Sequence, residues 1–364
     1  MIAQTLQAKP EVEKILQKAY EGNRLEFDEA MALFDADFLE LGRVADHRCR
    51  RLHPNDVVTF LIDLNLNYTN VCVTLCKFCA FYRHEGDTDA YLLSNDEILA
   101  KIEAMAALGG TQVLLQGGHH PRLGLDYYVK LTRQIKERFN VHMHSYSAAE
   151  IYHMAGVSKV TLREAVTELK LAGLDSIPGG GAEILSDRVR DEISPLKISA
   201  DEWFEVMEIA HELGMRTTAT MMFGSIETLA ERMQHLFRVR EHQDRTGKFR
   251  AFIPWSFSPE KTELENIRMA GGFDYLRMLA VSRLVLDNFK NIQAGWVTEG
   301  DKICQLGLSF GANDMGGILM EERVISATGL KYQTTVEQVL RMIRKAGKVP
   351  AQRNTKYEIL RLYR

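Results

Sequence analysis

The chain has 364 residues, 46% of them hydrophobic, and a formal net charge of −4, which is the composition of an ordinary folded globular protein. Its most basic runs, 48–51 and 361–364, are short, so we expect no nucleic-acid partner. No run approaches the roughly 20 apolar residues that cross a bilayer, and residues 1–14 lack the apolar core of an export signal. We therefore expect no membrane association and a cytoplasmic location.

Helical patterns and short apolar runs alternate along the chain. Residues 10–54 read as helical, with apolar positions among charges. The runs that follow are rich in β-branched residues, as in a parallel sheet covered on both faces. We predict strands at 57–65, 111–117, 141–146, 175–179, 216–224, 249–257, 291–300 and, with the weakest pattern, 308–314.

Helix-start signals lie between several of these strands. The capping-box spacing, in which a hydroxyl and a carboxylate satisfy the first free amides, occurs at Ser94/Glu97, Thr161/Glu164, Ser199/Glu202 and Thr334/Glu337. The strand–helix rhythm repeats about eight times, which predicts an α/β fold with a TIM-type (β/α) barrel. We predict three parts: an N-terminal helical extension (1–54), the barrel (55–333) and a C-terminal helical appendage (334–364).

Cysteine usage indicates a metal site in a reducing compartment. The chain has five cysteines, an odd number, and three of them fall within eight residues: Cys49, Cys72, Cys76, Cys79 and Cys304. A disulfide framework would suit a small secreted chain with paired cysteines, which this is not.

The three clustered cysteines follow the first predicted strand, with spacings of three and two residues. Soft thiolates suit an iron–sulfur cluster, which normally takes four of them. Only three are close here, so one iron is left open to another ligand. A zinc site with His84 as fourth ligand is the alternative, although zinc sites usually pair CxxC with a second couple. An electron carrier would need a fourth thiolate.

The pattern CxxxCxxC, with the aromatic Phe78 before its last cysteine and a place after the first barrel strand, resembles the signature of the radical S-adenosylmethionine (SAM) superfamily. The resemblance implies that Cys72, Cys76 and Cys79 hold a [4Fe-4S] cluster. It implies that the open iron binds the methionine part of SAM, and that one electron then releases a 5′-deoxyadenosyl radical. The electron would come from a donor such as a flavodoxin or a ferredoxin.

Polar and glycine-rich loops follow other predicted strands, where barrel ligands gather. Glycine lets backbone approach a ligand closely. By the resemblance, the glycine pair in the second-strand loop accepts hydrogen bonds from the SAM amino group, and Glu183 takes its ribose hydroxyls. The predicted SAM contacts are Phe78, Gln116, Gly117, Gly118, Ser147 and Glu183.

The resemblance extends over nearly the whole chain and points to the menaquinone/deazaflavin branch. The segments that carry it are NYTNVC, KFCAFYR, DAYLLS, TQVLLQGGHHP, SIPGGGAEIL, RTTATMMFG, FIPWSF and GANDMGG. They most resemble the cyclic dehypoxanthine futalosine synthase family of the futalosine route to menaquinone. Aminodeoxyfutalosine synthase and deazaflavin synthase are alternatives on the same scaffold. Ser225 departs from the family, whose members often have histidine there.

The resemblance implies a substrate, dehypoxanthine futalosine, and a ring closure. A hydrogen atom leaves the 4′ carbon of the sugar, the carbon radical adds to the benzoate-type ring, and loss of a proton and an electron completes a spiro product. Glu299 and His144 are the predicted proton acceptors, and each could instead be a structural hydrogen-bond partner. The substrate and catalytic candidates are Tyr68, Arg83, His144, Trp255, Glu299, Asn313 and Asp314.

Overall fold

The computed structural model describes residues 10–319, 321–330 and 334–364. Its α-helices are α1 (Pro10–Glu21), α2 (Phe27–Ala32), α3 (Phe38–Leu52), α4 (Asn95–Ala107), α5 (Leu125–Arg138), α6 (Ala148–Ser158), α7 (Leu162–Ala172), α8 (Asp187–Ile193), α9 (Ala200–Glu212), α10 (Leu229–Thr246), α11 (Gly272–Val285), α12 (Gly300–Gly307) and α13 (Val336–Lys345). Its strands are β1 (Val57–Asn67), β2 (Gln112–Gln116), β3 (His142–Met143), β4 (Thr217–Phe223), β5 (Phe249–Ser256), β6 (Asn291–Ile292), β7 (Asp314–Leu319), β8 (Val349–Arg353) and β9 (Ile359–Leu362).

The parallel strands form a barrel, as predicted. One sheet contains β3, β2, β1 and β7, and a second contains β4, β5 and β6. Bridges His144↔Ser176 and Gln293↔Asp314 join the sheets through extended backbone, and Thr218 N donates to Ile177 O at 3.3 Å. Every carboxyl strand end in this ring therefore opens toward the same mouth, where barrel ligands bind.

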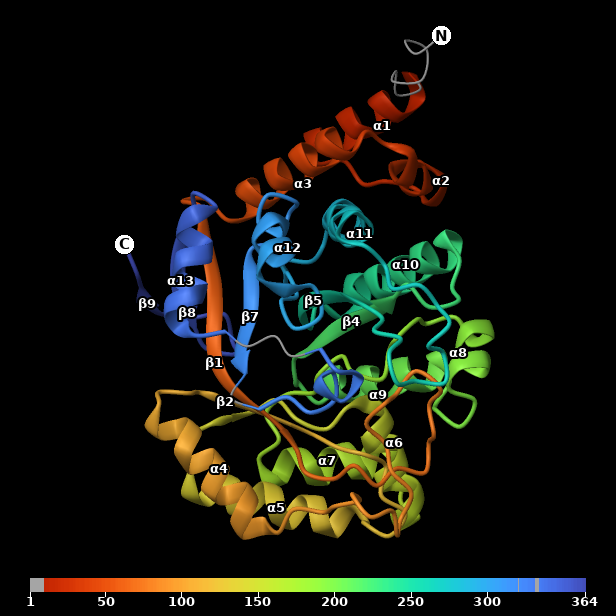
Figure 1. The fold of residues 1–364 in the computed structure, drawn as a ribbon, viewed down its shortest axis with the longest axis vertical. Helices are drawn as coiled ribbons and strands as arrows, with labels where there is room; N and C mark the ends of the chain where they lie inside the picture. Colours follow the sequence, from red (N-terminus) through yellow and green to blue (C-terminus); the bar gives the residue numbers. More distant parts are fainter. Residues whose placement is uncertain (1–9, 320, 331–333) are drawn as a thin grey trace.

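The N-terminal helices lie outside this ring. Figure 1 shows α1, α2 and α3 together at one end of the view, away from α4 to α7. Helix α3 packs along α11 and buries Leu41, Val44 and Ala45, the apolar stripe that its sequence repeats every three or four residues. No helix in the described residues is long and apolar enough to span a bilayer.

Three of the four predicted capping boxes are confirmed, at Ser94, Thr161 and Ser199. The fourth lies one residue later than predicted, because Thr335 caps α13 with Gln338 as its partner.

The predicted strand at 308–314 is wrong. Helix α12 continues to Gly307, and the buried apolar residues Leu308 and Phe310 pack in the core as the chain leaves that helix. The strand runs from Asp314 to Leu319 instead. Asn313 and Asp314 therefore lie at the amino end of a strand, opposite the mouth, and not at its carboxyl end as predicted.

The C-terminal segment differs from the expected helical appendage. Only α13 is helical, and the chain then returns to the sheet, where β8 lies parallel to β1 with Val57 opposite Val349. Strand β9 pairs with β8 in the antiparallel sense. The boundary predicted between 333 and 334 therefore does not mark the end of the sheet, and the three-part division of the chain stays a prediction.

A buried ion pair joins this C-terminal strand to the barrel. Arg353 Nε and Nη2 donate to the two carboxylate oxygens of Asp314 at 2.5 and 2.8 Å, and Thr59 donates to the same carboxylate. Both charged side chains are almost fully buried. The pair fixes β8 against the amino ends of β1 and β7.

Breaking this pair should destabilise the fold. We expect Arg353→Met to lower the free energy of unfolding by about 3–5 kcal/mol, because it leaves the Asp314 carboxylate buried and unpaired. Urea denaturation measures the change, with the exposed Arg361→Met as control. Equal midpoints for the two variants would contradict the assigned role of the pair.

Candidate active site

The cysteine loop connects β1 to α4 and is tied to its neighbours by backbone hydrogen bonds. Cys72 N donates to Arg83 O at 3.1 Å, Val73 N to His119 O at 3.1 Å and Lys77 N to Ile193 O at 2.8 Å. Arg83 also supports the loop from inside, since its guanidinium donates to Tyr82 O at 2.7 Å and pairs with Asp89. To bind the substrate as predicted, the Arg83 guanidinium would have to give up some of these contacts.

The three thiols lie close enough to influence one another. Burial raises the pKa of Cys76 to about 12, the Lys197 ammonium opposes this, and Cys79 and Cys72 add to the rise. Burial also raises the pKa of Cys79. A cluster spreads its ligands over several irons, so the sulfurs need not converge on one atom, and in the described residues no three His, Cys, Asp or Glu side chains do so.

The glycine loop after β2 lies directly against the cysteine loop. A Cβ on Gly118 would come within 2.3 Å of Val71 O, and one on Gly117 within 2.7 Å of the Tyr68 ring. Gly118 N donates to Thr69 O, and Gly117 N to Glu150 Oε1. The absence of side chains at these two positions is what lets the two loops touch.

Tyr68 and Ser147 support the site through Glu150, whose carboxylate also accepts a hydrogen bond from Gly117 N. The buried Tyr68 hydroxyl donates to Glu150 Oε1 at 2.9 Å, and its ring lies under Gly117. Ser147 caps α6, accepting from Glu150 N and donating to Glu150 Oε2. Their polar groups are thus engaged with Glu150, a buried carboxylate whose pKa burial raises.

Glu183 is held in an uncommon backbone conformation, with φ of 39°. Its Oε1 accepts from Lys197 Nζ at 2.7 Å, while its Oε2 is buried without a protein partner. The Lys197 ammonium lies 5.2 Å from the centre of the Phe78 ring, next to the cysteines. A buried carboxylate oxygen without a donor leaves room for a ligand hydroxyl, because such groups are normally hydrogen-bonded.

The barrel encloses a cavity of about 320 Å³. Gln116 and Gly180 line it, and a Cβ on Gly180 would lie 2.8 Å from Gln116 Nε2, which places the two glycine-rich loops together. Its lining also includes Leu61, Asp63, Asn65, Gln112, Leu114, His144, Thr218, Arg250, Ile253, Trp255, Trp296, Glu322, Arg353, Thr355 and Tyr357.

Of the remaining predicted candidates, His144 and Trp255 line the cavity, whereas Glu299 and Asn313 are not among its lining residues. His144 Nδ1 is hydrogen-bonded to Ser176 at 2.7 Å, and burial lowers the pKa of this imidazole well below its usual value. Glu299 accepts from Ser256 N and Thr298 Oγ1. Asn313 is engaged with Arg283, Asn291 and Ile292 N.

Several cavity residues were missed by reasoning from the sequence. Asp63 carried a signal, as the only acid in the apolar run 57–65. Arg250 is near the start of a strand, where a charged residue is common and does not by itself indicate a site. Arg353, Thr355 and Tyr357 were hidden because their segment was predicted as a helical appendage. Lys197, which lies against the Phe78 ring and outside the cavity lining, follows the short helix α8 and has no local sequence signature.

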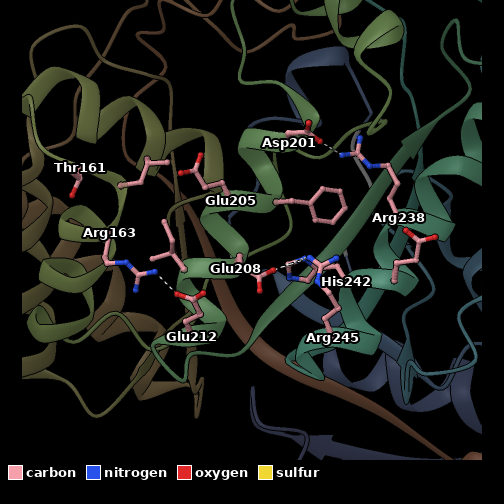
Figure 2. Close-up of a pocket in the computed structure, with 13 residues that line it drawn as sticks. Thr161, Arg163, Asp201, Glu205, Glu208, Glu212, Arg238, His242 and Arg245 are labelled. Carbon is pink, nitrogen blue, oxygen red and sulfur yellow. Dashed lines mark hydrogen bonds and ion pairs between the residues drawn. The ribbon is translucent and has the colours of Figure 1, made fainter.

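A second hollow, of about 810 Å³, lies on the outside of the barrel between α7, α9 and α10 (Figure 2). Its lining comes from helices only and not from strand ends. Ion pairs such as Arg163–Glu212 and Asp201–Arg238 cross it. It is separate from the site at the mouth.

Comparisons with known proteins agree with this geometry. The Radical SAM superfamily model matches residues 66–239, and the CofH/MqnC C-terminal region matches 246–364. Cyclic dehypoxanthine futalosine synthases of Halalkalibacterium halodurans and Streptomyces coelicolor are 45% and 46% identical over 97% of this chain, which covers 96% and 90% of their lengths. An aminodeoxyfutalosine synthase of Thermus thermophilus is 39% identical, with 97% of each chain covered.

The chain belongs to the radical SAM superfamily, in the branch of cyclic dehypoxanthine futalosine synthase. Its fold agrees with that of methylornithine synthase, with a TM-score of 0.73 at 18% identity and 93% and 97% coverage. The maturase HydG from Carboxydothermus hydrogenoformans gives 0.76 at 17% identity, with 95% and 80% coverage.

Membership makes the protein a radical SAM enzyme with a [4Fe-4S] cluster and SAM as cofactors, and the residues present fit both groups. The thiols of Cys72, Cys76 and Cys79 are the soft ligands that iron takes. Glu183 Oε2 has no donor within the protein, and the glycine loop beside the cysteines offers bare backbone. The individual cofactor contacts stay predictions.

Removing any one clustered cysteine should abolish cluster binding. We expect the alanine variants of Cys72, Cys76 and Cys79 to lose the visible absorbance of the reconstituted cluster. Cys304→Ala is the matched control, because this buried thiol lies against Ala294 O, away from the loop. Loss of the cluster in Cys304→Ala alone would contradict the three-thiolate site.

Glu183→Gln should weaken SAM binding. The loss of a charge-assisted hydrogen bond to a ribose hydroxyl corresponds to a roughly 10- to 100-fold higher Kd. Equilibrium binding to the reconstituted protein measures it, with Glu231→Gln on α10 as control. An unchanged Kd in Glu183→Gln would remove Glu183 from the cofactor site.

Proposed function

We propose that this enzyme converts dehypoxanthine futalosine to its cyclic product on the futalosine route to menaquinone. The observation that carries the proposal is the 45–46% identity to two synthases of that name over nearly the full chain. The cavity adds support, because apolar walls and a few polar groups suit a substrate with one aromatic ring and one sugar.

When bound, the cofactors would supply a carbon-centred radical able to take a hydrogen atom from the sugar. The protein must then hold the sugar at the mouth, beside Gln116 and Gly180, with the aromatic ring deeper in the barrel. Trp255 and Ile253 from β5 and Leu114 from β2 form apolar walls for that ring. Apolar walls of this kind limit the access of water, which protects a reactive intermediate.

Ring closure requires a group that accepts a proton, and we propose Asp63 for this task in place of His144 or Glu299. Asp63 Oδ2 accepts from Gln112 Nε2 at 3.0 Å, while Oδ1 is buried in the cavity wall without a partner. Burial raises the pKa of Asp63 to about 7, against the effect of Arg353. A carboxylate with this pKa suits a general base at neutral pH.

Turnover should therefore depend on the ionisation of Asp63. A base acts only when it is deprotonated, so kcat/KM should fall about tenfold per pH unit below pH 7 and level off above it. We expect the kcat/KM of Asp63→Asn to be low at all pH values and not to fall further below pH 7. The exposed Asp96→Asn, on α4, should keep the wild-type profile. A wild-type profile in Asp63→Asn would refute the assignment.

The substrate is tested by anaerobic reconstitution with dithionite and SAM. Addition of dehypoxanthine futalosine should give 5′-deoxyadenosine and the cyclic product. If that substrate yields no 5′-deoxyadenosine while the substrate of aminodeoxyfutalosine synthase does, the protein is the sister enzyme. In the cell, we propose that a flavodoxin or ferredoxin supplies the electron, in a cytoplasm where thiols stay reduced.

A further inference from the structure

One guanidinium group in the cavity, that of Arg250, forms no ion pair among the residues that the structure describes. Arg250 is the second residue of β5, and an irregularity in the strand pairing sets its direction. Thr217 lies opposite Phe249 and Ala219 lies opposite Phe252. Strand β5 therefore advances by three residues over a stretch in which β4 advances by two, so β5 contains one extra residue. Such a bulge shifts the alternation of side chains. As a result Arg250 shares the cavity lining with Ile253 and Trp255, which an unbroken strand would not allow.

The hydrogen bonds of Arg250 are few and long. Its Nε is buried without a partner, and its Nη1 has only contacts of 3.4 Å to His142 Nε2 and 3.5 Å to Thr355 O. Within the described part of the chain, no carboxylate lies within ion-pair distance of it. Arg353, the other guanidinium of the lining, is committed to Asp314.

Arg250 nevertheless carries its charge at neutral pH. Burial, and then the nearby Arg216, lower the pKa of Arg250 to about 10. The carboxylate of Asp175 opposes this fall in pKa, but Asp175 is paired with Lys136. A largely buried cation without an ion-pair partner of its own is costly, so a site that keeps one suits a ligand that brings the opposite charge. The planar guanidinium matches a carboxylate in particular, because both can pair through two parallel hydrogen bonds.

The surroundings of Arg250 indicate what this carboxylate is attached to. Between Arg250 and the mouth, the cavity is walled by Leu61, Ile253, Trp255 and Trp296, which suits an aromatic ring. Arg250 and Trp255 are five positions apart on β5, and because the bulge takes up one of these steps the span is about 13 Å. That length accommodates an aryl carboxylate together with a sugar that reaches the glycine loops.

We infer that Arg250 binds the carboxylate of the substrate's benzoate ring and so sets the orientation of the substrate, ring deep and sugar at the mouth. This inference rests on the proposed function. Arg250 on β5 then binds and positions the substrate, whereas Asp63 on β1 accepts the proton.

The test compares dehypoxanthine futalosine with its carboxamide analogue in the reconstituted holoenzyme. The analogue keeps the shape and removes the charge. We expect the wild type to bind the acid roughly 10- to 100-fold more tightly than the amide. In Arg250→Gln this preference should fall to within a few-fold, through loss of affinity for the acid alone. KM for the acid should rise more than kcat falls.

Arg216→Gln is the matched control, because this exposed guanidinium lies nearby but outside the cavity lining and should leave the preference intact. If Arg250→Gln does not fold, Arg250→Lys takes its place, since it keeps the charge and loses the paired hydrogen bonds; we expect it to retain only part of the preference. Retained cluster absorbance confirms folding of either variant.

A wild-type preference for the acid in both Arg250 variants would overturn the inference while leaving the function standing. A wild type that fails to turn over dehypoxanthine futalosine at all would instead overturn the proposed function. The two failures are therefore distinguishable in one series of measurements.

Discussion

Closure of the parallel strands into a ring is the constraint on which the site depends. Because every strand of the ring runs in the same direction, the loops that follow β1 and β2 and the loop that carries Glu183 all open at one mouth. The cysteine and glycine loops can touch there only because Gly117 and Gly118 lack side chains. The same ring surrounds the cavity below them, so the proposed radical chemistry at the mouth and the proposed substrate site in the barrel belong to one continuous space.

Several buried charges of the barrel form ion pairs, whereas those of Asp63 and Arg250 do not. Asp314 and Arg353 neutralise each other at the amino ends of the strands and hold the C-terminal strand in place. Glu183 and Lys197 form a second buried pair beside the cysteines. Asp63 and Arg250 differ from these groups because neither forms an ion pair within the described residues, and Asp63 Oδ1 and Arg250 Nε, like Glu183 Oε2, are buried without a protein partner. Unsatisfied groups are rare in folded proteins, and their position in the cavity wall is what links them to the substrate.

Local sequence patterns predicted the barrel, most of its strands and the cysteine loop, because these features depend on neighbours in the chain. The segment 308–314 was misplaced because a buried apolar run reads alike in a strand and at a helix end. That error put Asn313 and Asp314 at the wrong end of the barrel. Residues 349–353 were assigned to a helical appendage because their pairing with β1 joins segments nearly 300 residues apart, and periodicity carries no record of such a contact. Arg250 faces the cavity through a bulge, which the pattern of β5 does not reveal.

The proposed position of the sugar beside the cofactor is tested most directly by following the hydrogen atom that leaves its 4′ carbon. Dehypoxanthine futalosine carrying deuterium at the 4′ carbon of its sugar would be turned over anaerobically, and the 5′-deoxyadenosine analysed by mass spectrometry. A sugar held at the mouth predicts one deuterium in 5′-deoxyadenosine and none at that carbon in the cyclic product. Turnover that leaves 5′-deoxyadenosine unlabelled would contradict the placement of the sugar beside the cofactor, and with it the orientation of the substrate in the barrel.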